Sequence, residues 1–66
     1  MKIILNGVEE IIPDGLSITD LIEWVKEGDP HLMVEVNNTY IYPKEYDRVW
    51  VRENDRIEMI NPNLGG

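Results

Sequence analysis

The architecture of this chain follows from its residues 2–12, KIILNGVEEII. Lys2 to Leu5 is a short apolar-rich run, and Asn6-Gly7 follows it directly. An Asn-Gly pair between two such runs is the strongest short signal for a β-hairpin, because a type I′ turn needs positive φ at both central residues. We therefore expect two antiparallel strands, 2–5 and 8–12, joined by this turn.

Residues 16–27 carry a helical pattern after the turn cluster at 13–15. The apolar residues that recur at helical spacing are Ile18, Leu21, Ile22 and Val25. Ser17 or Thr19 can cap the start of this helix, and Gly28 is placed to follow its last residue. We therefore expect one amphipathic helix that buries a single stripe.

Three further strands are expected, at residues 32–37, 39–42 and 56–60. Residues 44–53 show no clear period, and the sequence does not predict their structure. One helix can cover one face of a small mixed sheet. The expected fold is therefore α+β, a ubiquitin-like β-grasp in which the last strand lies parallel to the first.

This arrangement divides the chain into a β-grasp domain at 1–60 and a flexible tail at 61–66 that ends on two glycines. Successive side chains of a strand point to opposite faces of the sheet. If the helix covers one face, Ile4 and Ile60 are expected on the open face.

Composition excludes several classes of function. The chain has 66 residues and a net charge of -7, from 13 acidic and 6 basic residues. Nucleic acids and anionic membranes both attract basic proteins, so neither is an expected partner. With no cysteine and one histidine, we expect no disulfide, no metal site and no bound cofactor. No apolar run reaches membrane-spanning length, so the expected location is the cytoplasm.

The terminal pair Gly65-Gly66 is the strongest functional signal. Glycine lacks a Cβ, so a diglycine end can enter a channel that excludes other residues. Such an end suits a protein whose own carboxylate is the substrate of another enzyme. The alternative is a frayed terminus, since most termini are poorly ordered.

Several motifs together resemble one family. They are Asn6-Gly7, Gly15 before the helix, the strand ending at Asn37, Pro43-Lys44, Asp55-Arg56-Ile57-Glu58, and Gly65-Gly66. At this spacing and chain length they are similar to the ubiquitin-like sulfur carriers of the ThiS/MoaD group, and most of all to the ThiS carriers of thiazole synthesis. The family often has Gly-Asp before the last strand. Asn54 stands here instead, and asparagine tolerates a left-handed turn.

The resemblance implies a carrier and not an enzyme, with no catalytic residue of its own. A ubiquitin-activating-type adenylyltransferase would use ATP to attach AMP to Gly66. A persulfide-bearing enzyme would then supply sulfur, giving a thiocarboxylate that a thiazole synthase consumes for thiamine biosynthesis. Gly65 would supply clearance in the partner's channel, and Leu64 would anchor the tail at its mouth.

Partner recognition is expected on the open face, through a patch of Ile4, Ile41 and Ile60 with Glu58 on its acidic rim. The alternative is that these are ordinary surface isoleucines. Three other functions stay open at this point. They are a molybdopterin-type sulfur carrier, a ubiquitin-like modifier joined to proteins through Gly66, and an interaction domain whose tail has no role.

Overall fold

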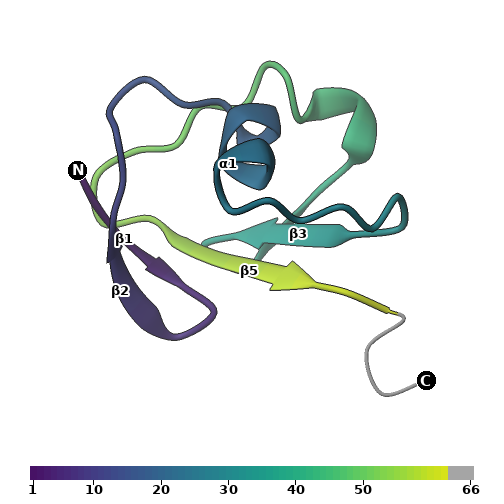
Figure 1. Cartoon of the computed structure of the whole chain (residues 1–66), viewed down its shortest axis with the longest axis horizontal. Helices are drawn as coiled ribbons and strands as arrows, with labels where there is room; N and C mark the ends of the chain where they lie inside the picture. Colours follow the sequence, from purple (N-terminus) through teal and green to yellow (C-terminus); the bar gives the residue numbers. More distant parts are fainter. Residues whose placement is uncertain (63–66) are drawn as a thin grey trace.

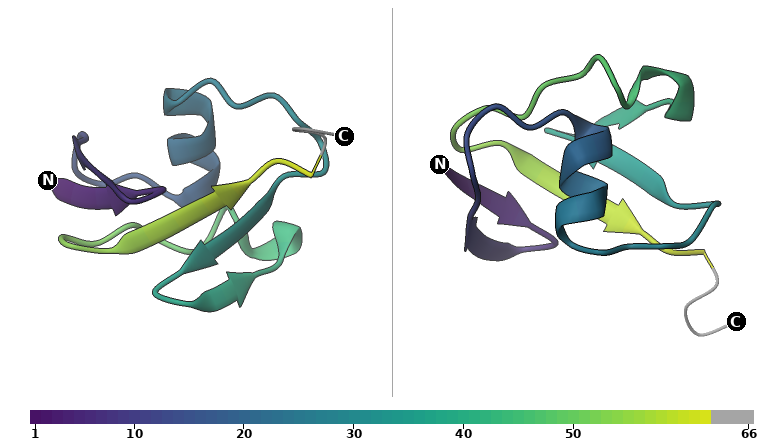
Figure 2. Two further views of the ribbon diagram at one scale, coloured as in Figure 1. Left: turned by 90° about the horizontal axis from the view of Figure 1, so that it is seen from below. Right: turned by 45° about the horizontal axis from the view of Figure 1, so that its top comes forward.

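The computed structural model describes residues 1–62 of the chain. The elements of this part are β1 (Lys2–Leu5), β2 (Val8–Ile11), α1 (Ile18–Trp24), β3 (Met33–Val36), β4 (Thr39–Ile41), the 3₁₀-helix η1 (Pro43–Glu45) and β5 (Arg56–Ile60). The five strands form one sheet in the order β2-β1-β5-β3-β4. β1 and β5 are parallel and the other neighbours are antiparallel. Helix α1 lies across one face of the sheet, as Figures 1 and 2 show. The predicted α+β, β-grasp arrangement is confirmed.

The β1–β2 hairpin forms at the predicted turn. Asn6 and Gly7 have φ angles of 50° and 82°, and Leu5 pairs with Val8 across them. Asn6 also reaches a strand far away in the sequence, because its Oδ1 accepts a hydrogen bond of 2.8 Å from the backbone N–H of Met59. The turn is therefore fastened to the central strand β5.

Helix α1 begins where a capping box closes its first turn. Ser17 Oγ accepts the backbone N–H of Asp20, and Asp20 Oδ2 accepts the backbone N–H of Ser17, both at 3.1 Å. Two backbone donors that would lack helical partners are thereby satisfied. Of the two predicted caps, the structure uses Ser17.

The helix ends earlier than the sequence predicts. Lys26, and not Gly28, takes the left-handed conformation, with φ of 62°. Two hydrogen bonds close this end, from Lys26 N–H to Glu23 O at 3.0 Å and from Glu27 N–H to Ile22 O at 3.1 Å. This pattern is a Schellman motif, which satisfies carbonyls in the last turn. The prediction that Gly28 ends the helix was wrong, because these two hydrogen bonds hold Lys26 in the left-handed conformation instead.

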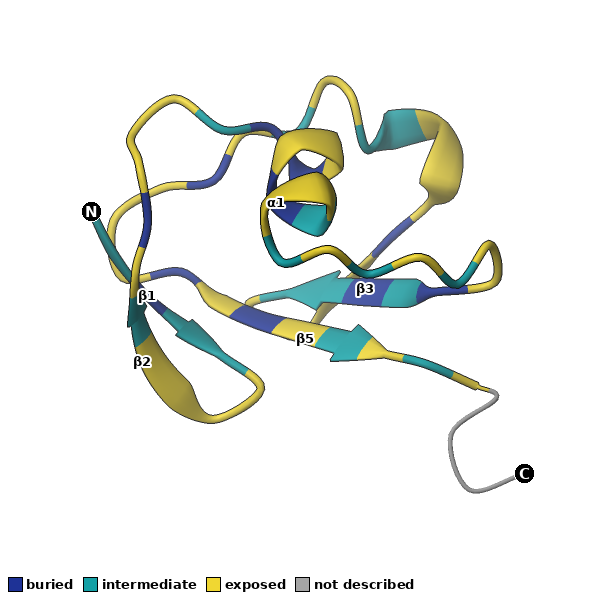
Figure 3. Ribbon diagram, in the orientation of Figure 1, coloured by how far each residue is buried: buried dark blue, intermediate teal, exposed yellow. Residues whose placement is uncertain are grey.

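The core lies between α1 and the covered face of the sheet, where Figure 3 shows the buried residues. The side chains with no exposed surface are Ile3, Ile18, Leu21, Val34 and Ile57. Leu5 and Met59 pack against this cluster from β1 and β5. The predicted alternation along these two strands is therefore confirmed.

Residues 44–53, for which the sequence shows no periodic pattern, have a defined structure. After η1 the chain turns at residues 46–48 and then lies antiparallel to the start of α1, where Trp50 and Ser17 form an isolated β-bridge. Val51 is buried in the core and Val49 packs against it, whereas Trp50 between them is 57% exposed. This alternation fixes which side chains of the segment are available at the surface.

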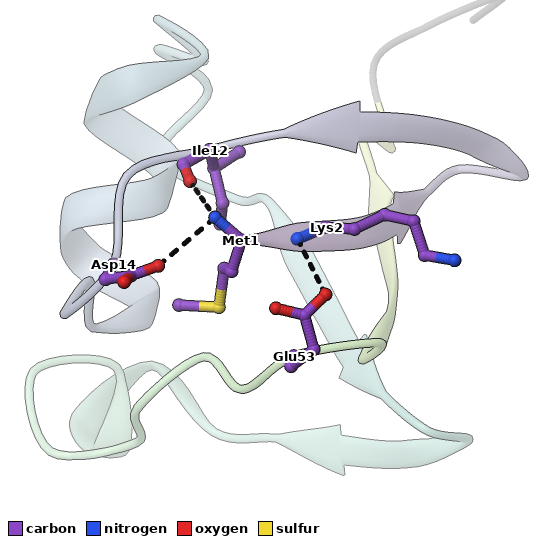
Figure 4. A network of polar contacts seen from close by, with 5 residues as sticks. All are labelled: Met1, Lys2, Ile12, Asp14 and Glu53. Atoms are coloured by element: carbon purple, nitrogen blue, oxygen red, sulfur yellow. Dashed lines mark hydrogen bonds and ion pairs between the residues drawn. The ribbon is translucent and has the colours of Figure 1, made fainter.

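Polar contacts fasten the first residues of the chain to two loops, as Figure 4 shows. The amino group of Met1 donates to the carbonyl of Ile12 at 2.6 Å and lies 3.1 Å from Asp14 Oδ1. The backbone N–H of Lys2 donates to Glu53 Oε2 at 3.1 Å. These contacts join the hairpin to the loops on either side of it.

Candidate functional site

The open face of the sheet carries an apolar group at the end of β5 that leads to the tail. Ile60 lies opposite Met33 of β3. Ile41 pairs with Val34 in the antiparallel β3–β4 pair. The next residue, Tyr42, therefore lies opposite Met33 and extends the row formed by Ile60 and Met33. Ile60 and Tyr42 are 43% and 57% exposed, and Met33 is half-buried. This row places exposed apolar surface beside the exit of the chain from the sheet.

Tyr40, two residues before Tyr42 and therefore on the same face of the sheet, completes this apolar group. Its ring contacts that of Tyr42 edge to face, with centroids 4.8 Å apart and an interplanar angle of 82°. Edge-to-face packing of this kind stabilises the relative position of two rings. We call Met33, Tyr40, Tyr42 and Ile60 the tail-side patch. It lies on the face away from α1.

Two carboxylates lie directly beside the patch. Glu58 of β5 is paired with Glu35 of β3, and Tyr40 is the partner of Glu35 on the other side. Glu58 is exposed and Glu35 is half-buried. Like charges directly opposite each other across a sheet are unfavourable. A cationic group of a partner would relieve this repulsion, so the patch is suited to an apolar surface that also presents lysine or arginine.

The structure corrects the predicted position of Ile41. Ile41 is only 9% exposed. Its cross-strand partner is Val34, which is fully buried under the helix, and directly opposite residues share a face. Ile41 is therefore a residue of the covered face and does not belong to an open-face patch.

Ile4 lies on the open face, as predicted, but away from Ile60. It is opposite Arg56 in the parallel β1–β5 pair and opposite Glu9 on β2. Ile60 is four residues farther along β5 than Arg56, a separation of about 13 Å along the strand. The two isoleucines therefore do not form one patch, and Ile4 is half-buried between charged neighbours.

The sequence analysis did not identify Met33, Tyr40 and Tyr42 as residues of the candidate site. A usable signal was present in the alternation of residues 40–42. Once Ile41 points toward the helix, both flanking tyrosines must point to the open face. Nothing comparable in the sequence reveals that Met33 lies next to Ile60, because that neighbour relation depends on the β3–β5 register.

The residues expected to do the chemistry, Gly66 with Gly65 and Leu64, lie outside the described residues. The start of the predicted tail is described. Asn61 is half-buried, and its Nδ2 donates to Glu27 Oε1 at 3.4 Å. The chain thus leaves the sheet beside the segment that follows α1.

Within residues 1–62 the side chains of His, Cys, Asp and Glu do not gather in a group of three that would suit a metal ion. Glu9 and Glu10 are paired with Ile4 and Ile3, so they point to opposite faces of the sheet. The described part also contains no helix with the length and apolar character needed to cross a bilayer.

Comparison with known proteins agrees with this geometry. The sequence matches the model of the ThiS family over residues 2–66, nearly the whole chain. The chain belongs to the ThiS family. A curated relative, the uncharacterized protein ycf40 of Trieres chinensis, is 26% identical over 62 residues, which are 94% of this chain and 85% of that protein.

Among solved structures, the thiamine biosynthesis protein ThiS from Geobacter metallireducens superposes with a TM-score of 0.86. The match covers 100% of both chains at 23% sequence identity. At that identity the likeness shows a shared fold, and it identifies the β-grasp of this chain as the fold of a ThiS protein.

Proposed function

We propose that this chain is a sulfur carrier of thiamine biosynthesis and that Gly66 bears the sulfur. The observation that carries the proposal is the ThiS family match, which runs to residue 66 and therefore includes the terminal diglycine. The solved structure of the same fold is itself named as a thiamine biosynthesis protein. Among the alternatives with a terminal diglycine, the family match favours the thiazole pathway over the molybdopterin pathway.

The proposed chemistry begins with a carboxylate that must be activated, because an oxide is too poor a leaving group for direct substitution. A carboxylate oxygen of Gly66 attacks the α-phosphorus of ATP in the partner adenylyltransferase, and pyrophosphate leaves. A persulfide sulfur then attacks the acyl carbon and AMP leaves, giving an acyl disulfide. A thiol reduces that disulfide and is itself oxidised, which releases the thiocarboxylate for the thiazole synthase.

In this proposal the chain supplies a substrate end and a recognition surface, and the catalytic groups belong to its partners. The tail-side patch is the proposed contact with the adenylyltransferase. Its support is its position, since β5 ends at Ile60 and the tail follows. Exposed apolar groups with an acidic rim suit a partner surface that combines apolar and basic residues. The proposed location, in line with these partners, is the cytoplasm.

Intact-protein mass spectrometry tests the proposal. The chain is incubated with the adenylyltransferase from the same organism, ATP, a persulfide donor and a thiol. The wild type should gain the mass of one oxygen-to-sulfur exchange, located at Gly66 by fragmentation. A chain that lacks Gly66, and one extended beyond it, should gain nothing. Gly65→Val should load slowly, because it adds a β-branched side chain to the thin segment.

The unfolding midpoint in urea serves as the control for these variants, since none of them alters residues 1–62. Loading of the shortened chain, or failure of the wild type to load, would exclude the sulfur-carrier function. Linkage of Gly66 to lysines of other proteins in the same reaction would instead identify a protein modifier.

A further inference from the structure

A second surface feature lies at the other end of the sheet. It is a groove of about 350 Å³ between the end of β3 and the segment before β5, and Arg48, Trp50 and Arg52 line it. Asn37 and Asp55, which also line it, sit beside the first residue of β5, whereas the tail-side patch lies at the last. The length of β5 therefore separates the groove from the tail-side patch.

The fold leaves the ring of Trp50 available. Val49 and Val51 turn inward, so alternation directs Trp50 outward, and it is 57% exposed. Backbone hydrogen bonds hold the segment that carries this ring. Ile18 N–H donates to Val49 O, and Val51 N–H donates to Leu16 O, both at 2.9 Å. An exposed tryptophan on a fixed backbone is a ready contact for an apolar group.

The two arginines of the groove are also available. Among residues 1–62, the guanidinium of Arg52 has no hydrogen bond or ion pair. In the same part of the chain, the guanidinium of Arg48 makes two long contacts, 3.4 Å from Nη2 to the carbonyl of Lys44 and 3.9 Å from Nε to Asp47 Oδ1. These positive side chains stand out in a chain whose net charge is -7.

The carboxylate of Asp55, which also lines the groove, is already engaged in hydrogen bonds. Asp55 is 8% exposed. Its Oδ1 accepts from Asn37 Nδ2 at 3.0 Å, and its Oδ2 accepts from the backbone N–H of Arg52 at 2.8 Å. The position of Arg52 is fixed as a result, while its guanidinium stays at the surface. Asp55 is buried, whereas Arg48, Trp50 and Arg52 are exposed, so these three side chains form the accessible surface of the groove.

We propose that this groove binds an acidic segment of a partner protein, with Asp or Glu side chains on Arg48 and Arg52 and an apolar side chain on Trp50. Guanidinium groups bind carboxylates through paired charge-assisted hydrogen bonds, and tryptophan and arginine dominate the binding energy of protein interfaces. The groove does not resemble a phosphate site built from backbone N–H groups. The backbone N–H of Val49 already donates to the carbonyl of Glu45, and the backbone N–H of Arg52 already donates to Asp55 Oδ2. The proposal does not depend on the chemistry at Gly66.

Fluorescence titration of the full chain tests the groove. The chain has two tryptophans, so Trp24→Phe leaves Trp50 as the only one. The probe is a short synthetic peptide that alternates glutamate and leucine. Its addition should change the emission of Trp50 saturably, whereas a peptide with lysine in place of glutamate should have no effect. Arg52→Glu should weaken binding about ten-fold or more.

Lys26→Glu is the matched control, because it makes the same charge change at an exposed residue that does not line the groove. Its effect on affinity should be less than about two-fold, as for a charge outside the contact. Equal weakening by Lys26→Glu and Arg52→Glu would overturn the proposal, as would no saturable binding of the acidic peptide.

Displacement of the peptide by inorganic phosphate at equal concentration would identify a plain anion site. An emission change on concentrating the chain alone would identify a second copy as the occupant. Either result would also overturn the proposal.

Discussion

Asn37 and Asp55, 18 residues apart in the sequence, join the two turns that flank the start of β5 through a hydrogen bond of 3.0 Å between Asn37 Nδ2 and Asp55 Oδ1. Each residue also fixes backbone. Asn37 Oδ1 accepts from Arg56 N–H at 2.9 Å, and Asp55 Oδ2 accepts from Arg52 N–H at 2.8 Å. Two side chains thus position the first residue of the central strand.

Loss of the Asp55 carboxylate should therefore destabilise the fold. Asp55→Ala leaves Asn37 Nδ2 and the Arg52 N–H without their acceptor, and we expect the free energy of unfolding to fall by about 1–3 kcal/mol. Asp55→Asn keeps an acceptor and should cost less. Asp47→Ala, at an exposed residue, is the control. Urea denaturation measures all three, and equal stability of Asp55→Ala and Asp47→Ala would contradict the role of this residue.

Leu21 should be the residue of α1 on which the core depends most. It is fully buried in the middle of the helix. Leu21→Ala should lower the free energy of unfolding by about 2–5 kcal/mol, which combines lost apolar burial with a cavity. Glu23→Ala, an exposed change in the same helix, should shift it by less than about 0.5 kcal/mol. A loss below about 1 kcal/mol for Leu21→Ala would show that the site repacks.

Tyr46 should make stability fall at high pH. Burial, and secondarily the nearby Tyr40, raises the pKa of Tyr46 above its ordinary value of 10.0. The folded state thus holds this proton more tightly than the unfolded chain. The resulting stabilisation is fully present below pH 10 and is lost as the pH rises through the higher folded pKa.

Tyr46→Phe isolates this effect. It removes the titrating group together with the hydrogen bond of 3.1 Å to the carbonyl of Leu32. At neutral pH the variant should be less stable by roughly 1 kcal/mol. Between pH 9 and pH 11, a range around the ordinary tyrosine value of about 10, its stability should fall less steeply than that of the wild type. Parallel curves from urea denaturation across that range would refute the assignment.

The tail-side patch should control loading of the chain without controlling its stability. Ile60→Asp places a charge in the exposed row beside Met33 and Tyr42, and we expect kcat/KM for sulfur loading to fall about ten-fold or more. Ile11→Asp is the matched control, because Ile11 is 72% exposed on the outermost strand β2. Its loading rate should stay close to that of the wild type. If both variants load equally well, the adenylyltransferase uses another surface.

Short-range signals were sufficient for most of the fold. Asn6-Gly7 specified the hairpin because only a few residues accept positive φ at both turn positions. The predicted left-handed Asn54 is confirmed by its φ of 68°. The apolar stripe gave the helix and its face. The predicted end of the helix was wrong. The Schellman motif at Lys26 depends on backbone hydrogen bonds, and a lysine in the sequence gives no signal for such a motif.

The sequence by itself determined the five strands and the helix, the alternation of side chains between the two faces within each strand, and the terminal diglycine that the ThiS family match contains. Tertiary structure decided the register of the strands and the pairing of β3 with β5. The register places Met33 opposite Ile60 and Tyr42 in the same row. It pairs Ile41 with Val34 on the face that the helix covers. It also pairs Ile4 with Arg56. It also brought Asn37 to Asp55, at the groove that Trp50 lines. The physical reason is that alternation repeats every two residues within a strand, whereas the alignment of two distant strands depends on how both pack against the core.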